Sequence, residues 1–272
     1  MSKKILVLPD VQAKHGNDFT YLKRIGTYML EKKPEIVVCI GDFADLESLS
    51  SYDKGKKSFE GRRYKRDVEA SKEAMRAFLE PMNDYNERAR RFKEKLYRPR
   101  MVMTLGNHEH RISRATEDSP QFDGLLSVDA LEYKEFGWEV YPFLQVVVID
   151  GIAFSHYFGT GVMGRPASTA AAQLRVANMS CFAGHQQGKQ IHYGKRADGS
   201  IITSIISGSC YEHEESYLGA QGNSHWRGFW MLNDINNGAF DEMPVSLSYI
   251  NKKYPHVTFD PNRLETITKR FQ

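Results

Sequence analysis

The chain has little cysteine and no long apolar run. Its 272 residues include three cysteines, Cys39, Cys181 and Cys210. An odd number of cysteines set among apolar or small residues indicates buried free thiols in a reducing compartment rather than a disulfide framework. No apolar stretch approaches the ~20 residues of a membrane-spanning helix, and residues 5–9 are too few for the core of a signal peptide. We therefore expect a cytoplasmic protein that has no membrane partner.

Neither sign of charge dominates the chain. Its 37 lysines and arginines stand against 34 acidic residues, which gives a net charge of +3. This balance neither requires nor excludes nucleic acid as a partner, so the basic residues must be judged by where they cluster. The length allows one large core, and repeats are lacking. We expect a single domain over residues 1–250 with a helical insertion at about 46–98, followed by a C-terminal tail at 251–272.

Five short polar clusters each follow an apolar, strand-like run. They are Asp10-Val11-Gln12, Gly41-Asp42, Gly106-Asn107-His108-Glu109, Ser155-His156 and Gly184-His185-Gln186-Gln187. Residues 4–8 and 35–40 are predicted as strands that flank a helix at 17–33, and residues 100–105 repeat the strand pattern. Parallel strands deliver site residues from their carboxyl ends. The clusters are therefore expected to lie together at one edge of a sheet.

The later part of the chain carries hairpin signals. Residues 138–156 are predicted to form a hairpin that turns at Asp150-Gly151, and residues 191–207 are predicted to form a second one. A further turn is predicted at residues 236–238. Early parallel units followed by hairpins indicate an α/β protein with two packed mixed sheets flanked by helices.

Two other segments bear on the architecture. Residues 67–97 are predicted as one or two charged helices, with a break or a new start at Pro81 because proline lacks the N–H that a helix interior needs. Trp226, Trp230 and Met231 fit a buried strand better than a contact between subunits. The sequence does not indicate the number of subunits.

The residue types in the five clusters suit a divalent cation. They supply carboxylate, amide and imidazole ligands without thiolate, from Asp10, Asp42, Asn107, His156 and His185. Asp10 alone is better explained as a cap of the segment that follows it. A second carboxylate at an equivalent strand end makes a shared cation the better interpretation, and the two histidines also end apolar runs. The sequence therefore predicts a metal site.

In order, the clusters resemble the signature of the calcineurin-like metallophosphoesterase superfamily, D-x-H, G-D, G-N-H-[ED], H and G-H-x-H, over roughly residues 4–215. Bacteriophage-encoded members resemble the chain most. The resemblance implies a four-layer αββα sandwich and phosphoester hydrolysis at two metal ions. It implies that the first metal is held by Asp10, Asp42 and positions 12 and 187, and the second by Asp42, Asn107, His156 and His185.

Two positions depart from the family pattern, and both fall on the first metal. Gln12 and Gln187 stand where the family has histidine. A neutral amide oxygen is a weaker donor than imidazole to late first-row metals and suits Mg or Mn better. We expect one or two divalent ions, with weaker binding at the first site. Manganese is the favoured metal, and Mg, Ni, Fe and Zn are the alternatives.

The resemblance also implies roles in catalysis. Asp42 would bridge the two ions, a metal-activated water would attack phosphorus, and His108 would protonate the leaving-group oxygen. We favour a phosphodiesterase that acts on nucleic acid or nucleotides. One alternative is a phosphomonoesterase or protein phosphatase, although the residues after Gly41-Asp42 lack the Arg-Gly of the protein-phosphatase branch. The other is a catalytically silent metal-binding interaction module.

Four arginines are candidates for binding the substrate phosphate. Arg62 and Arg63 belong to the segment 54–66, which holds seven basic residues against one acid, with Phe59 and Tyr64 interleaved. This pattern is typical of a clamp on a nucleic-acid backbone, and a solvated turn explains it equally well.

The other two candidates lie nearer to the predicted ligands. Arg111 follows His108 closely, and either it reaches substrate phosphate or it pairs with Glu109 or Asp118. Arg165 lies in the glycine-rich residues 159–166 just after His156, which are predicted to form a mobile loop beside the metals.

Overall fold

The computed structural model describes residues 3–52, 55–215 and 218–263. Its larger sheet has six strands, in the order β13 (Ala239–Ser246), β12 (Gly228–Asn236), β1 (Ile5–Leu8), β2 (Ile36–Cys39), β3 (Arg100–Thr104) and β4 (Glu139–Tyr141). The strands from β1 to β4 are parallel, whereas β12 is antiparallel to both of its neighbours. The sheet is therefore mixed.

The second sheet has five strands, in the order β10 (Lys189–Lys195), β11 (Ile201–Ser207), β9 (Cys181–Ala183), β6 (Ile152–Phe154) and β5 (Val147–Ile149). Its three central strands are parallel and its two edge strands are antiparallel to them. A separate small hairpin is formed by β7 (Gly159–Thr160) and β8 (Arg165–Pro166).

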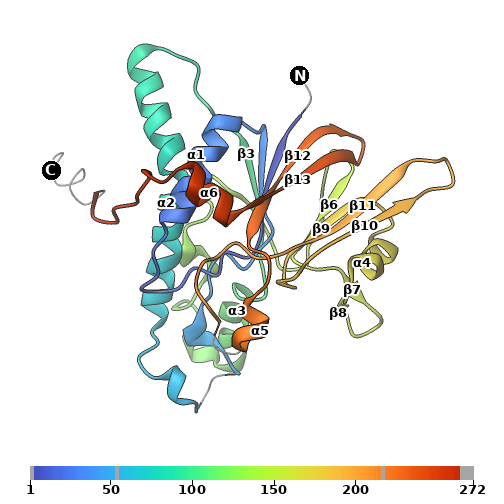
Figure 1. The fold of residues 1–272 in the computed structure, drawn as a ribbon. Helices are drawn as coiled ribbons and strands as arrows, with labels where there is room; N and C mark the ends of the chain where they lie inside the picture. The colour runs from blue at the N-terminus through green and yellow to red at the C-terminus, as the bar shows by residue number, and fades with distance from the viewer. Residues whose placement is uncertain (1–2, 53–54, 216–217, 264–272) are drawn as a thin grey trace.

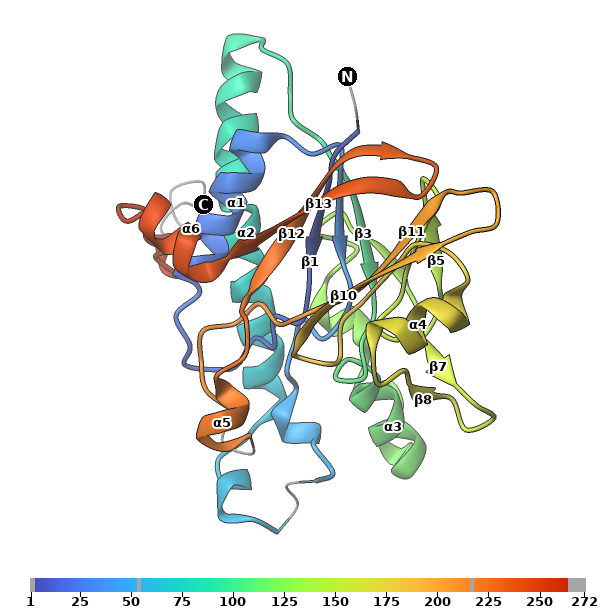
Figure 2. The same ribbon diagram turned by 45° about the vertical axis from the view of Figure 1, so that its right-hand side comes forward.

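Helices cover the outer faces of the two sheets. The longest pair, α1 (Thr20–Lys32) and α2 (Tyr64–Phe92), lies on one side of the molecule, and α4 (Ala170–Ala177) packs against β9, β10 and β11 on the other (Figure 1). The turned view shows the two sheets between these helices (Figure 2). The four-layer architecture expected from the sequence is therefore confirmed. The remaining helical segments are η1 (Glu47–Leu49), η2 (Lys57–Phe59), α3 (His110–Asp118), η3 (Pro120–Phe122), η4 (Val128–Leu131), α5 (Gly219–Asn223) and α6 (Leu247–Lys253).

The side chains of β1 show how the layers are held together. Ile5 and Val7 point between the two sheets, where they pack with Trp230, while Leu6 and Leu8 join the core beneath α1 and α2. This alternation follows from the two-residue period of a strand. Burial of each large apolar side chain contributes roughly 1.5–3 kcal/mol, so a central strand buried on both faces is firmly anchored.

The break predicted at Pro81 is wrong, because α2 is one continuous helix of 29 residues that contains Pro81. Tight packing against α1 accounts for the continuous helix. A Cβ atom added to Gly26 of α1 would lie 2.0 Å from the carbonyl oxygen of Phe78 and 3.2 Å from Cδ of Pro81. The two helices therefore touch where the proline interrupts the hydrogen-bond ladder. The apolar face of α2 belongs to the same core as α1 and the larger sheet.

The predicted hairpin over residues 138–156 is only half right. Its second half is present, because β5 and β6 pair around Asp150-Gly151. The first half, β4, instead extends the other sheet parallel to β3. A short, half-exposed strand such as β4 carries too little pattern to show which sheet it joins. The predicted turns of the β10–β11 and β12–β13 hairpins are both present.

Three further expectations concern the periphery and the thiols. Cys39, Cys181 and Cys210 are buried and free, as predicted. No helix in the described ranges is long and apolar enough to cross a membrane. Residues 251–263 lie along α1, where Arg24 donates hydrogen bonds to Asn251 at 2.9 Å and to the carbonyl of Val257 at 3.1 Å.

Candidate metal centre

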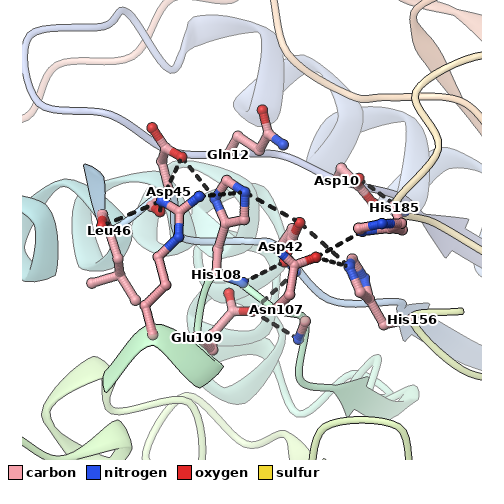
Figure 3. Close-up of polar contacts among 12 residues, drawn as sticks. Asp10, Gln12, Asp42, Asp45, Leu46, Asn107, His108, Glu109, His156 and His185 are labelled. Atoms are coloured by element: carbon pink, nitrogen blue, oxygen red, sulfur yellow. Dashed lines mark hydrogen bonds and ion pairs between the residues drawn. The ribbon is translucent and has the colours of Figure 1, made fainter. Parts of the chain in front are cut away.

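The site forms where parallel strands of both sheets end. Asp10, Asp42 and Asn107 follow β1, β2 and β3 of the larger sheet, and His156 and His185 follow β6 and β9 of the smaller one. The parallel registers bring these strand ends to one edge of each sheet. Side chains from both sheets consequently face one another in a single cluster (Figure 3).

The four predicted ligands of the second metal lie together. Ligand atoms of Asp42, His156 and His185 all lie within 4.8 Å of one another. The Oδ1 atom of Asn107 is 2.8 Å from Nε2 of His156 and 2.7 Å from Nδ1 of His185. One carboxylate, one amide oxygen and two imidazoles suit Mn, Fe, Zn or Ni at one shared position.

Glycines allow this close approach. A Cβ at Gly106 would lie 2.0 Å from Oδ1 of Asp42, and one at Gly184 would lie 2.2 Å from Oδ1 of Asp10. Gly41 has a φ of +91°, and a Cβ there would also meet the backbone of Gly106. Any residue other than glycine at these three positions would therefore displace a ligand from the cluster.

The backbone at the site is strained as well. Gln12, Asp42 and His185 have φ values of 46°, 49° and 63°. Non-glycine residues seldom adopt this left-handed region, which costs of the order of 1–3 kcal/mol per residue and is concentrated at functional sites. The surrounding fold therefore holds these three residues in a conformation that they would seldom adopt on their own.

His156 is arranged to present one nitrogen to a cation. Its Nδ1 lies 2.9 Å from the carbonyl oxygen of Ile40 and donates to it, which leaves Nε2 to face Asn107 and Asp42. Fixing one ring nitrogen with a carbonyl is the usual way of orienting a metal-binding histidine. Burial alone would lower the pKa of His156, but the charge and hydrogen bond of Asp42, together with the charge of Asp10 and the carbonyl of Ile40, outweigh it and raise the pKa to about 9. A proton therefore competes with a metal ion for Nε2.

Burial and neighbouring charges also shift the pKa values of Asp10, Asp42 and His185. Burial, helped by the charge of Asp42, raises the pKa of Asp10 to about 7. Burial also acts to raise the pKa of Asp42, but His108 and His156 outweigh it, and this pKa is well below its usual range. Burial and the charge of His156 lower the pKa of His185 to about 4. His185 is thus a neutral imidazole at pH 7, the form that binds metals.

The first metal position is altered as the sequence indicated. Nε2 of Gln187 lies 3.5 Å from Oε1 of Gln12, and the hydroxyl of Tyr211 donates to Oε1 of Gln187. Both amide oxygens thus face protein donors. Of the four residues expected around a first ion, only the two carboxylates Asp10 and Asp42 present charged oxygens. The residues fit one ion at the second position well and a further ion at the first position poorly.

Glu109 connects the loops that carry the ligands, a role the sequence did not reveal. This fully buried carboxylate accepts hydrogen bonds from the backbone N–H groups of Asp42 at 3.0 Å, Ala44 at 2.9 Å and Gly106 at 2.8 Å. The Tyr133 hydroxyl donates to it at 3.3 Å. Burial raises the pKa of Glu109, and these N–H groups oppose the rise. The loops after β2 and β3 are thereby fixed to one another.

His108 lies beside the cluster and is held by Asp45. Its Nδ1 is 2.7 Å from Oδ1 of Asp45, and its Nε2 is 3.6 Å from Oδ2 of Asp42. Burial alone would lower the pKa of His108, but the two carboxylates outweigh it and raise the pKa. Asp45 was missed as a site residue, although its spacing of three from Asp42 on the same loop was a usable signal.

One of the two alternatives considered for Arg111, a pair with Glu109 or Asp118, is wrong. Arg111 pairs with neither Glu109 nor Asp118. It donates to the carbonyls of Asp45 and Leu46 at 2.8 and 3.4 Å, and its Nη2 lies 3.0 Å from Nε2 of His108. The carboxylate of Glu109 is taken up by backbone N–H groups. Arg111 therefore lies at the edge of the site, where contact with a substrate phosphate stays a prediction.

A polar chain extends from Asp45 away from the cluster. Lys14 lies between Asp45 at 3.2 Å and Glu215 at 2.7 Å. Glu215 also lies 2.9 Å from Nε2 of His213, which stacks on the ring of Tyr211. Lys14 and Glu215 could not be recognised from the sequence, because only the fold brings residues from such distant segments together.

The remaining predicted substrate contacts are less direct. Arg62 pairs with Glu47, with Nε 3.4 Å from a carboxylate oxygen, and Arg63 donates to the carbonyl of Arg62 at 2.8 Å. Arg165 is exposed in the β7–β8 hairpin. Lys54, the first residue of segment 54–66, lies outside the described ranges. A role of these three arginines toward substrate stays a prediction.

Comparison with known proteins identifies the family. The calcineurin-like phosphoesterase family matches residues 3–187, well over half of the chain. The chain belongs to this family, and it is a metal-dependent phosphoester hydrolase. The superfamily inferred from the five clusters is therefore confirmed.

Relatives of the chain come from bacteriophages, as the resemblance had suggested. The Gene 54 protein of Mycobacterium phage L5 is 28% identical over 247 residues, which cover 85% of this chain and 89% of that protein. The Gene 54 protein of Mycobacterium phage D29 is 26% identical over 258 residues, which cover 89% and 93%. One solved structure aligns over 90% of this chain with a TM-score of 0.40 and 10% identity, a likeness too distant to inform the function.

Proposed function

We propose that the protein is a phosphodiesterase that acts on nucleic acid or nucleotides with a single tightly held divalent ion, manganese being the favoured metal. The convergence of Asp42, Asn107, His156 and His185 carries this proposal, because it supplies a complete ligand set at one position. When bound, such an ion activates a water molecule and neutralises charge on the phosphoryl oxygens. Action in the cytoplasm of a bacterial host belongs to the same proposal.

The chain's own residues supply the proton for the leaving group. The Asp45 carboxylate at Nδ1 fixes the ring of His108, so that Nε2 is on the side of Asp42. The carboxylates of Asp42 and Asp45 raise the pKa of His108, which favours the protonated ring that a general acid needs. As the bond from phosphorus to the leaving oxygen breaks, this proton passes to that oxygen. General acid catalysis of this kind contributes typically ~10²–10⁴-fold to the rate.

The diester preference rests on the surroundings of the site. Arg111 lies next to His108. The basic segment that contains Arg62 and Arg63 follows the predicted ligand Asp42 in the sequence. Cations that contact the substrate would favour one that carries more than one phosphate, because each neutralised phosphate adds electrostatic binding energy. A nucleotide or polynucleotide is such a substrate.

Hydrolysis of two model substrates tests the proposal. Metal-stripped protein is refilled separately with Mn, Mg, Ni or Zn and assayed with bis(p-nitrophenyl) phosphate and p-nitrophenyl phosphate, alongside His108→Ala and Asp42→Asn variants. We expect metal-dependent turnover of the diester that collapses in both variants. A preference for the monoester would point to a phosphatase. No turnover with any metal would contradict the proposal and favour a non-catalytic metal-binding module.

A further inference from the structure

A cavity of about 190 Å³ lies between η1 and α3, beside the metal centre. Residues 111, 114, 115 and 118 of α3 follow the three-to-four-residue spacing of one helix face and form one wall. The opposite walls come from η1 and from the segment after α3. The lining includes Ser48, Leu49, Arg111, Arg114, Phe122 and Leu126.

The cavity lies on the side of the site where the leaving group departs. Arg111 belongs both to the wall of the cavity and to the surroundings of His108, since its Nη2 is 3.0 Å from Nε2 of that histidine. His108 is the group proposed above to protonate the leaving oxygen. A leaving group that receives this proton therefore extends toward Arg111 and the cavity.

Arg114 is the cation that this cavity offers to a ligand. The guanidinium of Arg111 is already engaged by the carbonyls of Asp45 and Leu46. The Nε atom of Arg114, in contrast, is buried and lacks a hydrogen-bond partner among the described residues. Buried donors are nearly always paired, so this nitrogen calls for an acceptor, and the positive charge of the guanidinium favours an anionic one. Asp118 also lines the cavity and limits its positive charge.

The rest of the lining is apolar and includes an aromatic ring. Leu49 and Leu126 form the apolar walls, and Phe122 is 44% exposed. Aromatic side chains of this kind stack on nucleobases, with little regard to sequence. The volume is below the ~300 Å³ of a site for a drug-sized ligand. The cavity therefore holds one unit of a longer ligand, whose remainder stays in solvent.

We propose that this cavity binds the nucleotide on the leaving side of the scissile phosphodiester. The next phosphate along that nucleotide pairs with Arg114, and its base packs against Phe122. This inference rests on the proposed phosphodiesterase function and narrows its substrate to an oligonucleotide or polynucleotide. The protein would thus prefer a substrate that carries a phosphate one unit beyond the bond that it cleaves.

Binding to the metal-free protein tests the cavity without relying on catalysis. Thymidine 3′,5′-bisphosphate and thymidine are titrated into metal-stripped protein by calorimetry. If Arg114 forms a charge-assisted pair with a phosphate, Arg114→Ala should lower the affinity for the bisphosphate about tenfold or more, and Arg114→Lys should retain part of that affinity. The matched control is Arg175→Ala, which removes an exposed arginine from α4. Equal affinity of the wild type and Arg114→Ala for the bisphosphate would overturn the proposal.

Hydrolysis of dinucleotides provides the second readout. The thymidine dinucleotide dTpdT is compared with its 5′- and 3′-phosphorylated forms, since either side can be the leaving side. We expect one phosphorylated form to have a higher kcat/KM than dTpdT, by about tenfold, and Arg114→Ala to abolish this preference. If all three are cleaved equally by the wild type, the cavity proposal is wrong while the phosphodiesterase proposal stands. If neither the dinucleotides nor bis(p-nitrophenyl) phosphate are cleaved, the phosphodiesterase proposal itself fails.

Discussion

Replacing Glu109 with glutamine is expected to destabilise the protein by about 3 kcal/mol. The amide nitrogen of the glutamine must take the place of one carboxylate oxygen. At Oε2 it would face the N–H groups of Asp42 and Gly106, and at Oε1 it would face the N–H of Ala44 and the hydroxyl of Tyr133. The second arrangement is the less costly one, because a hydroxyl can turn and accept. It still leaves one buried N–H unpaired and converts two charge-assisted hydrogen bonds into neutral ones.

Each of these losses is about 1 kcal/mol or more, and together they give the stated value. For a domain of this size the melting temperature should fall by about 6–12 °C. Thermal unfolding followed by circular dichroism measures this change. Glu117→Gln is the matched control, since Glu117 is an exposed carboxylate on α3. A melting temperature of Glu109→Gln equal to that of the control would refute the role of Glu109 as a connection between the loops.

Three other predictions follow from the geometry of the site. Gly106→Ala places a Cβ 2.0 Å from a ligand oxygen and should weaken metal binding by at least an order of magnitude in equilibrium dialysis; Gly188→Ala, which has no atom within 4 Å of its added Cβ, should bind metal normally. Asp45→Asn removes a charge that raises the pKa of His108, so the alkaline limb of the kcat profile should move to lower pH, and an unmoved limb would exclude His108 as the acid. Because the pKa of His156 is raised to about 9, its proton stabilises the metal-free fold fully below the unfolded value of ~6.5, and this stabilisation is lost as pH rises through about 9. Thermal unfolding of metal-free protein across this window should show the loss, and a His156→Gln variant should not.

The sequence revealed the ligand positions because their chemistry is local. Each ligand ends an apolar strand, and parallel strands place such residues at one edge. Asp10, Asp42, Asn107, His156 and His185 could therefore be grouped before the fold was known, and the family resemblance implied which of them share the second ion. The structure brings Asp42, Asn107, His156 and His185 together at one position. The unbroken apolar run Ile5–Leu8 likewise sufficed to predict a buried strand.

Other features depended on contacts that a single sequence does not display. Glu109 follows His108 directly, yet its role comes from N–H groups on the loop after another strand. Lys14 and Glu215 meet through the fold alone. Pro81 was expected to end a helix, because the packing of Gly26 against that turn cannot be seen in the sequence.

A manganese titration of metal-stripped protein tests the central claim most directly. Hydrolysis of bis(p-nitrophenyl) phosphate is followed as Mn²⁺ is added, with bound metal counted in parallel. The arrangement of His156, His185, Asn107 and Asp42 predicts activity that saturates at one ion per chain and is abolished in Asp42→Asn. Full activity without metal, or in Asp42→Asn, would contradict the account.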